Sequence, residues 1–155
     1  MKLYSLEAVQ ELRLSLEDAW SFFSNPTNLA AITPPTLGFR IVSAVPPRMH
    51  EGLMIEYRVT PLLGLPVPWV TEITHVREPH YFVDEQRAGP YKLWHHEHIF
   101  EVIPGGVRMI DRVRYMLFLD PMSRLMHALL VRPKLEFIFE YRRKVLEQRF
   151  GGPLC

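Results

Sequence analysis

The sequence predicts an α+β fold in which a curved antiparallel sheet wraps around one long C-terminal helix. Short segments with alternating apolar and polar residues recur from Tyr4 to Tyr115, separated by turn-forming residues, which is typical of strands. The segment 134–150 instead repeats apolar residues at three- and four-residue steps, which is typical of an amphipathic helix. A sheet with one apolar face needs a cover, and this helix is the only predicted element large enough to provide it.

The N-terminal part predicts one strand followed by two short helices. The strand covers Tyr4–Leu14, where side chains alternate loosely. Ser15 is a favourable N-cap, with Asp18 three residues later, so the first helix begins there. The second begins at Pro26, because proline is favoured at the first helical position. It ends before Thr33-Pro34-Pro35, because a residue that precedes proline avoids helical geometry.

Six further strands complete a predicted seven-stranded sheet. Most are joined by short turns, so neighbours should run antiparallel. Their positions are Phe39–Val45, Leu53–Val59, Trp69–Arg77, Tyr81–Arg87 and the two strands of a hairpin within 89–100 and 109–115.

The hairpin gathers aromatic and polar side chains on one face. Because strand side chains alternate, Trp94, His96, His98 and Phe100 point the same way. A turn at Gly105-Gly106 would set Pro104 opposite Val107. The resulting pairs are Phe100 with Asp111, His98 with Val113, His96 with Tyr115, Trp94 with Leu117 and, on a solvated outer face, Glu97 with Arg114.

The C-terminal segment predicts a helical stretch from Asp120-Pro121, interrupted at Pro133, and then the long helix up to Gly151-Gly152. Charged residues Arg142, Arg143 and Lys144 are predicted to form part of a solvated face. The apolar stripe of the helix consists of Leu135, Ile138, Phe139, Leu146 and Phe150.

Composition narrows the class of protein. The 155 residues fit one domain over 1–155, with a net charge of +1 that offers no electrostatic case for nucleic acid binding. The only cysteine is Cys155, so no disulfide forms within the chain, which favours a reducing, cytoplasmic location. No signal peptide is visible, and no apolar run is long enough to span a membrane.

Several spaced motifs carry a resemblance that covers nearly the whole chain. They are Phe82-x-Asp84-x-Gln86-x-x-Gly89-Pro90-Tyr91, Trp94-x-His96-x-His98-x-Phe100, Asp111-x-Val113-x-Tyr115 and Ile138-Phe139-x-Tyr141-Arg142. The chain resembles the START-like (SRPBCC) superfamily, whose helix-grip fold includes plant Bet v 1-type allergens and polyketide cyclases. The motifs are similar to a bacterial branch labelled polyketide cyclase/dehydrase-like, or cell division inhibitor by association with a fused epimerase domain. The chain has no Gly-x-Gly-x-x-Gly motif for such a dinucleotide-binding domain.

The resemblance implies a hydrophobic cavity but no particular reaction. We therefore expect the protein to bind a small hydrophobic or aromatic ligand, such as a lipid, isoprenoid or polyketide-like molecule, between the sheet and the final helix, without a cofactor. The residues expected to contact the ligand are Tyr57, Trp69, Phe82, Asp84, Gln86, Trp94, His96, His98, Phe100, Asp111 and Tyr115.

The polar residues of the hairpin leave other functions open. His98 and Asp111, with His96, could form the proton-transfer pair of an aromatase/cyclase- or dehydratase-like enzyme, although no Ser or Cys nucleophile joins them. The same groups could instead be a purely structural hydrogen-bonded cluster. His-x-His on a strand also suits metal ligation, but Glu101 falls on the wrong face for a cupin-like site, so we expect no metal.

A third hypothesis is a protein-interaction module. The Pro61–Pro68 loop carries Leu62, Leu63 and Leu65, which would form an apolar surface. A second copy of the chain, giving a homodimer, is the candidate partner.

Overall fold

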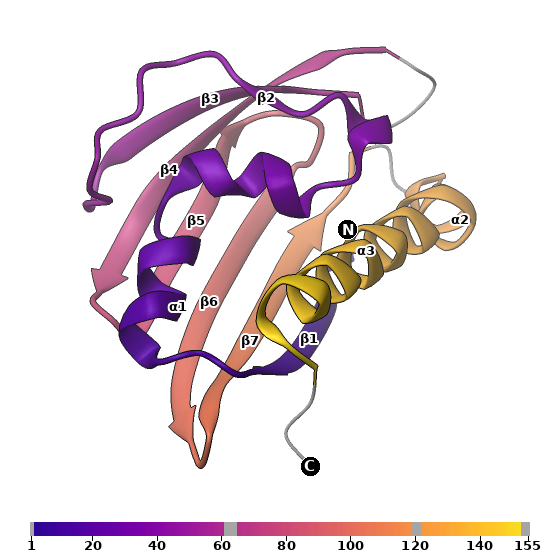
Figure 1. Ribbon diagram of the computed structural model, residues 1–155. Coiled ribbons are helices and arrows are strands. Elements are labelled where there is room, and N and C mark those ends of the chain that lie inside the picture. Colours follow the sequence, from indigo (N-terminus) through magenta and orange to yellow (C-terminus); the bar gives the residue numbers. More distant parts are fainter. Residues whose placement is uncertain (1, 61–64, 119–121, 153–155) are drawn as a thin grey trace.

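The computed structural model describes residues 2–60, 65–118 and 122–152. It is a seven-stranded antiparallel sheet with all helices on one side (Figure 1). The fold class predicted from the sequence is confirmed, and the arrangement is a helix-grip fold. In chain order the elements are β1 (Tyr4–Leu12), α1 (Leu16–Phe23), the 3-10 helices η1 (Pro26–Ile32) and η2 (Pro35–Leu37), β2 (Arg40–Ile41), β3 (Leu53–Val59), β4 (Val67–Arg77), β5 (Tyr81–Ala88), β6 (Leu93–Ile103), β7 (Gly106–Met116), α2 (Ser123–Met126), the π-helical turn η3 (His127–Val131) and α3 (Arg132–Phe150).

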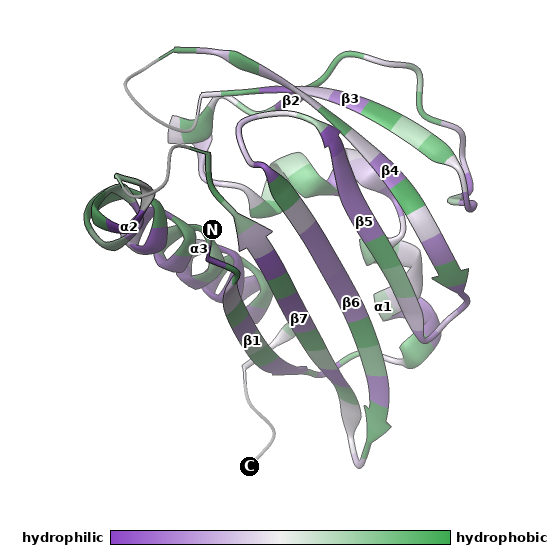
Figure 2. Cartoon of the chain, turned by 180° about the vertical axis from the view of Figure 1, so that it is seen from behind, coloured by the Kyte–Doolittle hydropathy of each residue, from purple (hydrophilic) through white to green (hydrophobic). Residues whose placement is uncertain are grey.

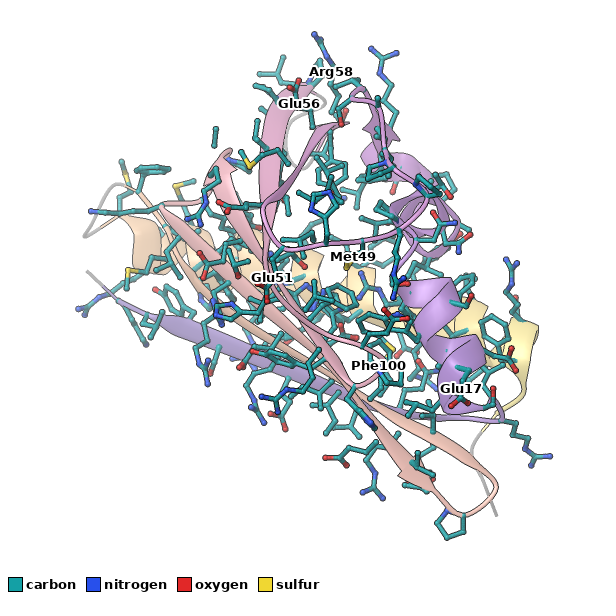
Figure 3. The ribbon with its side chains drawn as sticks, turned by 90° about the vertical axis from the view of Figure 1, so that its left-hand side faces the viewer. Glu17, Met49, Glu51, Glu56, Arg58 and Phe100 are labelled. Atoms are coloured by element: carbon teal, nitrogen blue, oxygen red, sulfur yellow. The ribbon has the colours of Figure 1, made fainter. Side chains whose placement is uncertain are left out.

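The sheet has one face toward the helices and one face toward solvent. Its strand order is β1-β7-β6-β5-β4-β3-β2, so β1 and β2 form the two edges. Seen from behind, the strands alternate between hydrophobic and hydrophilic residues (Figure 2). Along β3, Ile55 is buried whereas Glu56 and Arg58 point outward (Figure 3). This alternation follows from the two-residue period of a strand and leaves the apolar face for α1, η1 and α3.

The β6–β7 hairpin has a different register from the one the sequence predicted. Ile103 lies opposite Gly106, so the turn is Pro104-Gly105 rather than Gly105-Gly106. Gly105 has a φ of 82°, and proline followed by such a glycine fits a type II turn. The shift is two residues, so His98 lies opposite Asp111 instead of Val113. Because strand faces repeat every two residues, every side chain keeps its predicted face.

The same shift rearranges the other hairpin pairs. Facing pairs are now Phe100 with Met109, His96 with Val113, Trp94 with Tyr115 and Glu97 with Arg112. Glu97 still reaches Arg114, whose Nη1 lies 3.2 Å from Glu97 Oε2, as a diagonal pair on the outer face.

Elsewhere the predicted elements are present with altered bounds. The Phe39–Val45 strand is reduced to the two residues of β2. Arg40 and Ile41 pair with Arg58 and Tyr57 of β3, and beyond them the contacts with β3 continue only as the Val42 N–H bond to the Glu56 carbonyl and the Glu56 N–H bond to Ser43 Oγ among the described residues. Of the Pro61–Pro68 loop, Leu62 and Leu63 lie outside the described residues, as do Asp120-Pro121 and Cys155, whereas Leu65 is exposed.

The sequence predicted that Pro133 interrupts the C-terminal helix, but the helix continues through this residue. The chain continues from η3 directly into α3, with proline in the first turn. In η3 the Arg132 N–H bonds to the His127 carbonyl, five residues back. This wider turn lies directly before Pro133 and makes room for the proline ring, which in a regular α-helix would press on the carbonyl four residues earlier.

The helix α3 lies across the concave face of the sheet next to edge strand β1 (Figure 1). Leu135 and Leu146 of its stripe are buried, and Ile138, Phe139 and Phe150 are half-buried. Gln10 Nε2 of β1 donates to the Arg143 carbonyl at 2.9 Å, which ties the helix to the edge. Among the described residues, no helix combines the length and apolar character needed to cross a membrane.

Leu146 should be the main apolar anchor of α3. Its side chain is fully buried in the core formed with α1 and the sheet. We expect Leu146→Ala to lower the free energy of unfolding by about 2–5 kcal/mol, the usual cost of such a cavity. Phe137→Ala on the exposed side of the same helix should change it by about 0.5 kcal/mol or less. Urea unfolding measures both, and equal losses would contradict this packing.

Candidate functional site

A cavity of about 190 Å³ lies between the concave face of the sheet, the η1 segment and α3. Its wall is mostly apolar, with contributions from Ile55 and Ile73 of the sheet and from Leu135, Ile138 and Phe139 of α3. The main polar region of this wall is formed by Asp84, His96, His98 and Arg142, and separate polar groups come from Asn25, Asn28, Thr33, Thr71 and Lys134. The site is therefore a mostly apolar, partly open cavity in which four ionisable residues cluster at one place, with Lys134 as a further ionisable residue of the wall.

Aromatic rings form the wall next to the polar region. Trp69 of β4 and Trp94 of β6 pack edge to face at 5.3 Å, and Tyr91 packs against Trp94 at 4.8 Å. Gln86 fixes Tyr91, because its Nε2 donates to the Tyr91 carbonyl at 2.6 Å and its Oε1 accepts from the Tyr91 N–H at 3.2 Å. A Cβ on Gly89 would lie 2.5 Å from Gln86 Oε1, so only glycine lets Gln86 fold under this turn.

The polar cluster is assembled by three neighbouring strands and α3. Asp84 lies opposite His96 on β5 and β6, and His98 lies opposite Asp111 on β6 and β7. The hydrogen bonds run along the diagonals instead: His96 Nε2 is 2.8 Å from Asp111 Oδ1, and His98 Nε2 is 2.7 Å from Asp84 Oδ2. Diagonal neighbours on one face are within reach of long side chains.

Arg142 reaches the cluster from the helix. Its Nη1 lies 3.3 Å from Asp111 Oδ1, and its guanidinium group sits 5.0 Å from the centre of the Phe139 ring. The sequence prediction of a solvated face was wrong for Arg142, which is 8% exposed, and right for Arg143 and Lys144, which are exposed. Arg142 lies four residues from both Ile138 and Leu146, so helical spacing puts it on the buried stripe.

The cluster is electrically neutral when one of its imidazoles is protonated. Asp84 and Asp111 contribute two negative charges and Arg142 one positive charge, so a single imidazolium balances them. The nitrogens of His98 lie 2.7 and 3.1 Å from the two carboxylates, whereas those of His96 lie 2.8 and 3.5 Å away. The shorter contacts assign the extra proton to His98, although its Nδ1 meets Asp111 at an angle too poor for a hydrogen bond.

The pKa values of the two histidines move in opposite directions. Burial alone would lower the pKa of His98, but its contacts with Asp111 and Asp84 outweigh burial and raise it above the usual value. Burial and the nearby charge of His98 lower the pKa of His96. A neutral imidazole and an imidazolium therefore lie side by side, with ring centres 3.8 Å apart.

Both carboxyl groups stay ionised despite their burial. Desolvation would raise the pKa of Asp111, but the positive charge of Arg142 and hydrogen bonds from the histidines hold it well below the usual value. Desolvation likewise opposes ionisation of Asp84, but its interactions with the His96 and His98 rings, including the hydrogen bond from His98, lower its pKa. Buried anions of this kind are tolerated only when they are paired.

A second depression, of about 610 Å³, runs between β1 and α3. Asp111 and Tyr115 line this groove and not the cavity, whereas Arg142 lines both. Tyr115 bonds through its hydroxyl group to His127 Nε2 at 2.9 Å, and His127 stacks on Tyr4. The Asp111–Arg142 pair therefore separates the two spaces.

The residues expected to bind a ligand fall into two groups. Gln86 acts through the backbone of Tyr91, Phe100 is packed in the core, and Asp111 and Tyr115 face the groove. The others line the cavity: Tyr57, Trp69, Phe82, Asp84, Trp94, His96 and His98. Sequence reasoning missed Arg142, for which helical spacing was an available signal, and Tyr91 and Thr71, which also line the cavity.

The cluster also has the ligand types of a metal site. Ligand atoms of Asp84, His96 and His98 all lie within 4.8 Å of one another. Metal ligation requires imidazole lone pairs, but His98 Nε2 is engaged with Asp84 and His96 Nε2 with Asp111. Arg142 and the imidazolium already balance the two carboxylates, so a cation would have to displace protons to enter.

Comparisons with known proteins identify the fold. The sequence matches no family model and no curated protein. Protein Ms6760 from Mycobacterium smegmatis has a similar structure, with TM-score 0.65, 17% identity, and coverage of 96% of this chain and 98% of that one. The protein TTHA0849 from Thermus thermophilus gives TM-score 0.67 and 18% identity, covering 94% and 96%. Ara h 8.0201, a Bet v 1-like structure, gives TM-score 0.60 and 14% identity, covering 95% and 99%. These likenesses show a shared fold.

The opposed pKa values can be measured by NMR titration of the two imidazole rings. We expect His98 to titrate above the ordinary value of about 6.5 and His96 below it. Folded His98 then keeps a proton that the unfolded chain releases, so its stabilising contribution is complete below about pH 6.5 and is lost as the pH rises through the folded-state pKa. His98→Gln should remove this loss of stability at alkaline pH. The control His75→Gln, at an exposed histidine, should show the same loss as the wild-type protein. Reversed order of the two pKa values would contradict the proton assignment.

Proposed function

We propose that this protein binds a small hydrophobic or aromatic molecule in the cavity between the sheet and α3. The observation that carries the proposal is a mostly apolar cavity in which Asp84, His96, His98 and Arg142 converge, the usual composition of a small-molecule site. The fold class adds support, because Bet v 1-like folds often bind small hydrophobic ligands. The polar end of the ligand meets Asp84, His96, His98 and Arg142, and its apolar part meets the aromatic wall.

The cavity volume narrows the size of the ligand. Drug-sized ligands occupy pockets of about 300–1,000 Å³, whereas an apolar cavity of about 150 Å³ holds benzene. At about 190 Å³, this cavity suits a compound of one substituted ring. Among lipid, isoprenoid and polyketide-like molecules, compact cyclic ones therefore fit within the cavity, and a longer chain would extend beyond it.

Filling the cavity should abolish binding. Ile138 lines the cavity from α3, whereas its neighbour Phe137 is half-exposed and lies outside the wall. We expect Ile138→Trp to weaken the affinity for ethylbenzene by tenfold or more, because the larger side chain takes the ligand's place, and Phe137→Trp to leave it unchanged. NMR titration with amide detection measures both. A wild-type protein without saturable shifts at cavity residues would exclude this binding function.

A proton-transfer enzyme of the polyketide cyclase or dehydratase kind is the second candidate. It is favoured by the side-by-side imidazoles, because paired groups with pKa values pushed apart are suited to act as base and acid. Neutral His96 is the base in this scheme and protonated His98 the acid, and both line the cavity. Asp111 does not line it, so it acts through the histidines as a positioning residue.

Solvent exchange at carbon tests this candidate without knowledge of the natural substrate. The base removes a proton next to a carbonyl group while the acid protonates the oxygen, and reversal in D₂O leaves deuterium on carbon. We expect the wild-type protein to accelerate deuteration of the acetophenone methyl group and His96→Gln to lose at least 100-fold of that acceleration, since general base catalysis contributes about 10²–10⁴-fold. Bound acetophenone that exchanges no faster than free acetophenone would reject catalysis and leave the binding function intact.

A further inference from the structure

Three buried side-chain nitrogens lack a hydrogen-bond partner within the described parts of the chain. They are Trp69 Nε1, His98 Nδ1 and Arg142 Nε. All three residues line the same cavity. Buried polar groups in folded proteins nearly always have partners, so their coincidence in one enclosure needs an explanation.

Two of these nitrogens can only donate. Indole Nε1 and guanidinium Nε carry hydrogens and have no acceptor capacity. His98 Nδ1 differs, because the Asp111 carboxylate 3.1 Å away compensates its charge. Trp69 and Arg142 therefore present uncompensated donors, and they do so from opposite walls, the sheet strand β4 and the helix α3.

Among the described residues, no side-chain or backbone acceptor bonds to Trp69 Nε1. Its ring packs edge to face with Trp94 and lies 5.6 Å from the ring of Tyr91. These contacts hold the indole in place and surround it with aromatic surface. Because Trp69 lines the cavity, an occupant of the cavity can supply an acceptor for this N–H.

The charge of the cluster indicates what kind of acceptor fits. With one imidazolium, the groups Asp84, Asp111, His98 and Arg142 sum to zero. A carboxylate ligand at this cluster would add a buried negative charge there, and the other cation of the cavity wall, Lys134, is half-buried with its Nζ over the ring of the exposed Phe137. An uncharged carbonyl oxygen accepts hydrogen bonds and leaves the balance intact.

We infer that the ligand is an uncharged carbonyl compound, such as a cyclic or aryl ketone, whose oxygen accepts a hydrogen bond from Trp69 Nε1 or Arg142 Nε. This inference rests on the proposed ligand-binding function and adds the chemical class of the ligand. Trp69 supplies the cleaner test, because Arg142 is also tied to the charge of Asp111.

The test compares two probes of nearly equal shape. Acetophenone and ethylbenzene share the ring and a two-carbon side chain, and only acetophenone has a carbonyl oxygen. Trp69→Phe keeps an aromatic ring and removes the N–H, so it should weaken acetophenone binding about two- to tenfold, the range for one neutral hydrogen bond. The same change should alter ethylbenzene affinity less than twofold. Trp20→Phe, which lies in the core outside the cavity wall, should affect neither.

Indole N–H resonances give a second readout that does not depend on affinity. The Trp69 signal, assigned by its absence in Trp69→Phe, should move downfield with saturating acetophenone and not with ethylbenzene. One outcome overturns the carbonyl inference: both probes bind, Trp69→Phe weakens both equally, and the indole signal does not move. Water would then satisfy these donors, and the ligand-binding function would still stand. If neither probe binds, the proposed function itself fails.

Discussion

The carboxylate of Asp111 joins the sheet to its helix. It is buried on β7, accepts a hydrogen bond from His96 of β6, and faces Arg142 of α3. An ionised carboxylate in this position is tolerated only with such partners. The requirement for a cation above Asp111 places one turn of α3 over β7, the strand next to edge strand β1, and the apolar anchors Leu135 and Leu146 lie on either side of that turn.

That placement shapes both hollow spaces of the molecule. With Arg142 held at Asp111, the pair forms a partition between the enclosed cavity and the groove beside β1. His96, His98 and Asp84 line the cavity, and Tyr115 and His127 line the groove. A charge-neutral partition lets four ionisable groups border an apolar cavity without a net buried charge. It also gives the two histidines different protonation states, which is what makes a proton-transfer role chemically reasonable.

Much of the architecture could be predicted because it depends on periodicity. The two-residue period of His96 and His98 identified their shared face even though the hairpin register was two residues out, since such an error preserves faces. The register itself depended on whether Pro104-Gly105 or Gly105-Gly106 makes the turn, and glycine pairs leave this ambiguous. The short β2 was overpredicted, because an edge segment alternates like a strand without finding a long partner.

The sequence predicted part of the candidate site and missed Arg142. Arg142 was assigned to solvent by its charge, whereas its spacing from Ile138 and Leu146 puts it on the buried stripe. Charge misled because the compensating carboxylate lies 31 residues earlier in the chain, on another element. Pairings that cross between elements, such as His98 with Asp84, follow from three-dimensional packing and cannot be read from one strand.

A double-mutant cycle between Asp111→Asn and Arg142→Met tests this partition most directly. Each single change leaves a buried charge without its partner, whereas the double change removes both charges. Unfolding free energies should therefore be non-additive, with a coupling of about 1–3 kcal/mol and a double variant less damaged than the sum of the two. Additivity within about 0.5 kcal/mol would mean that the two residues act independently, and the central role given to their pairing would be contradicted.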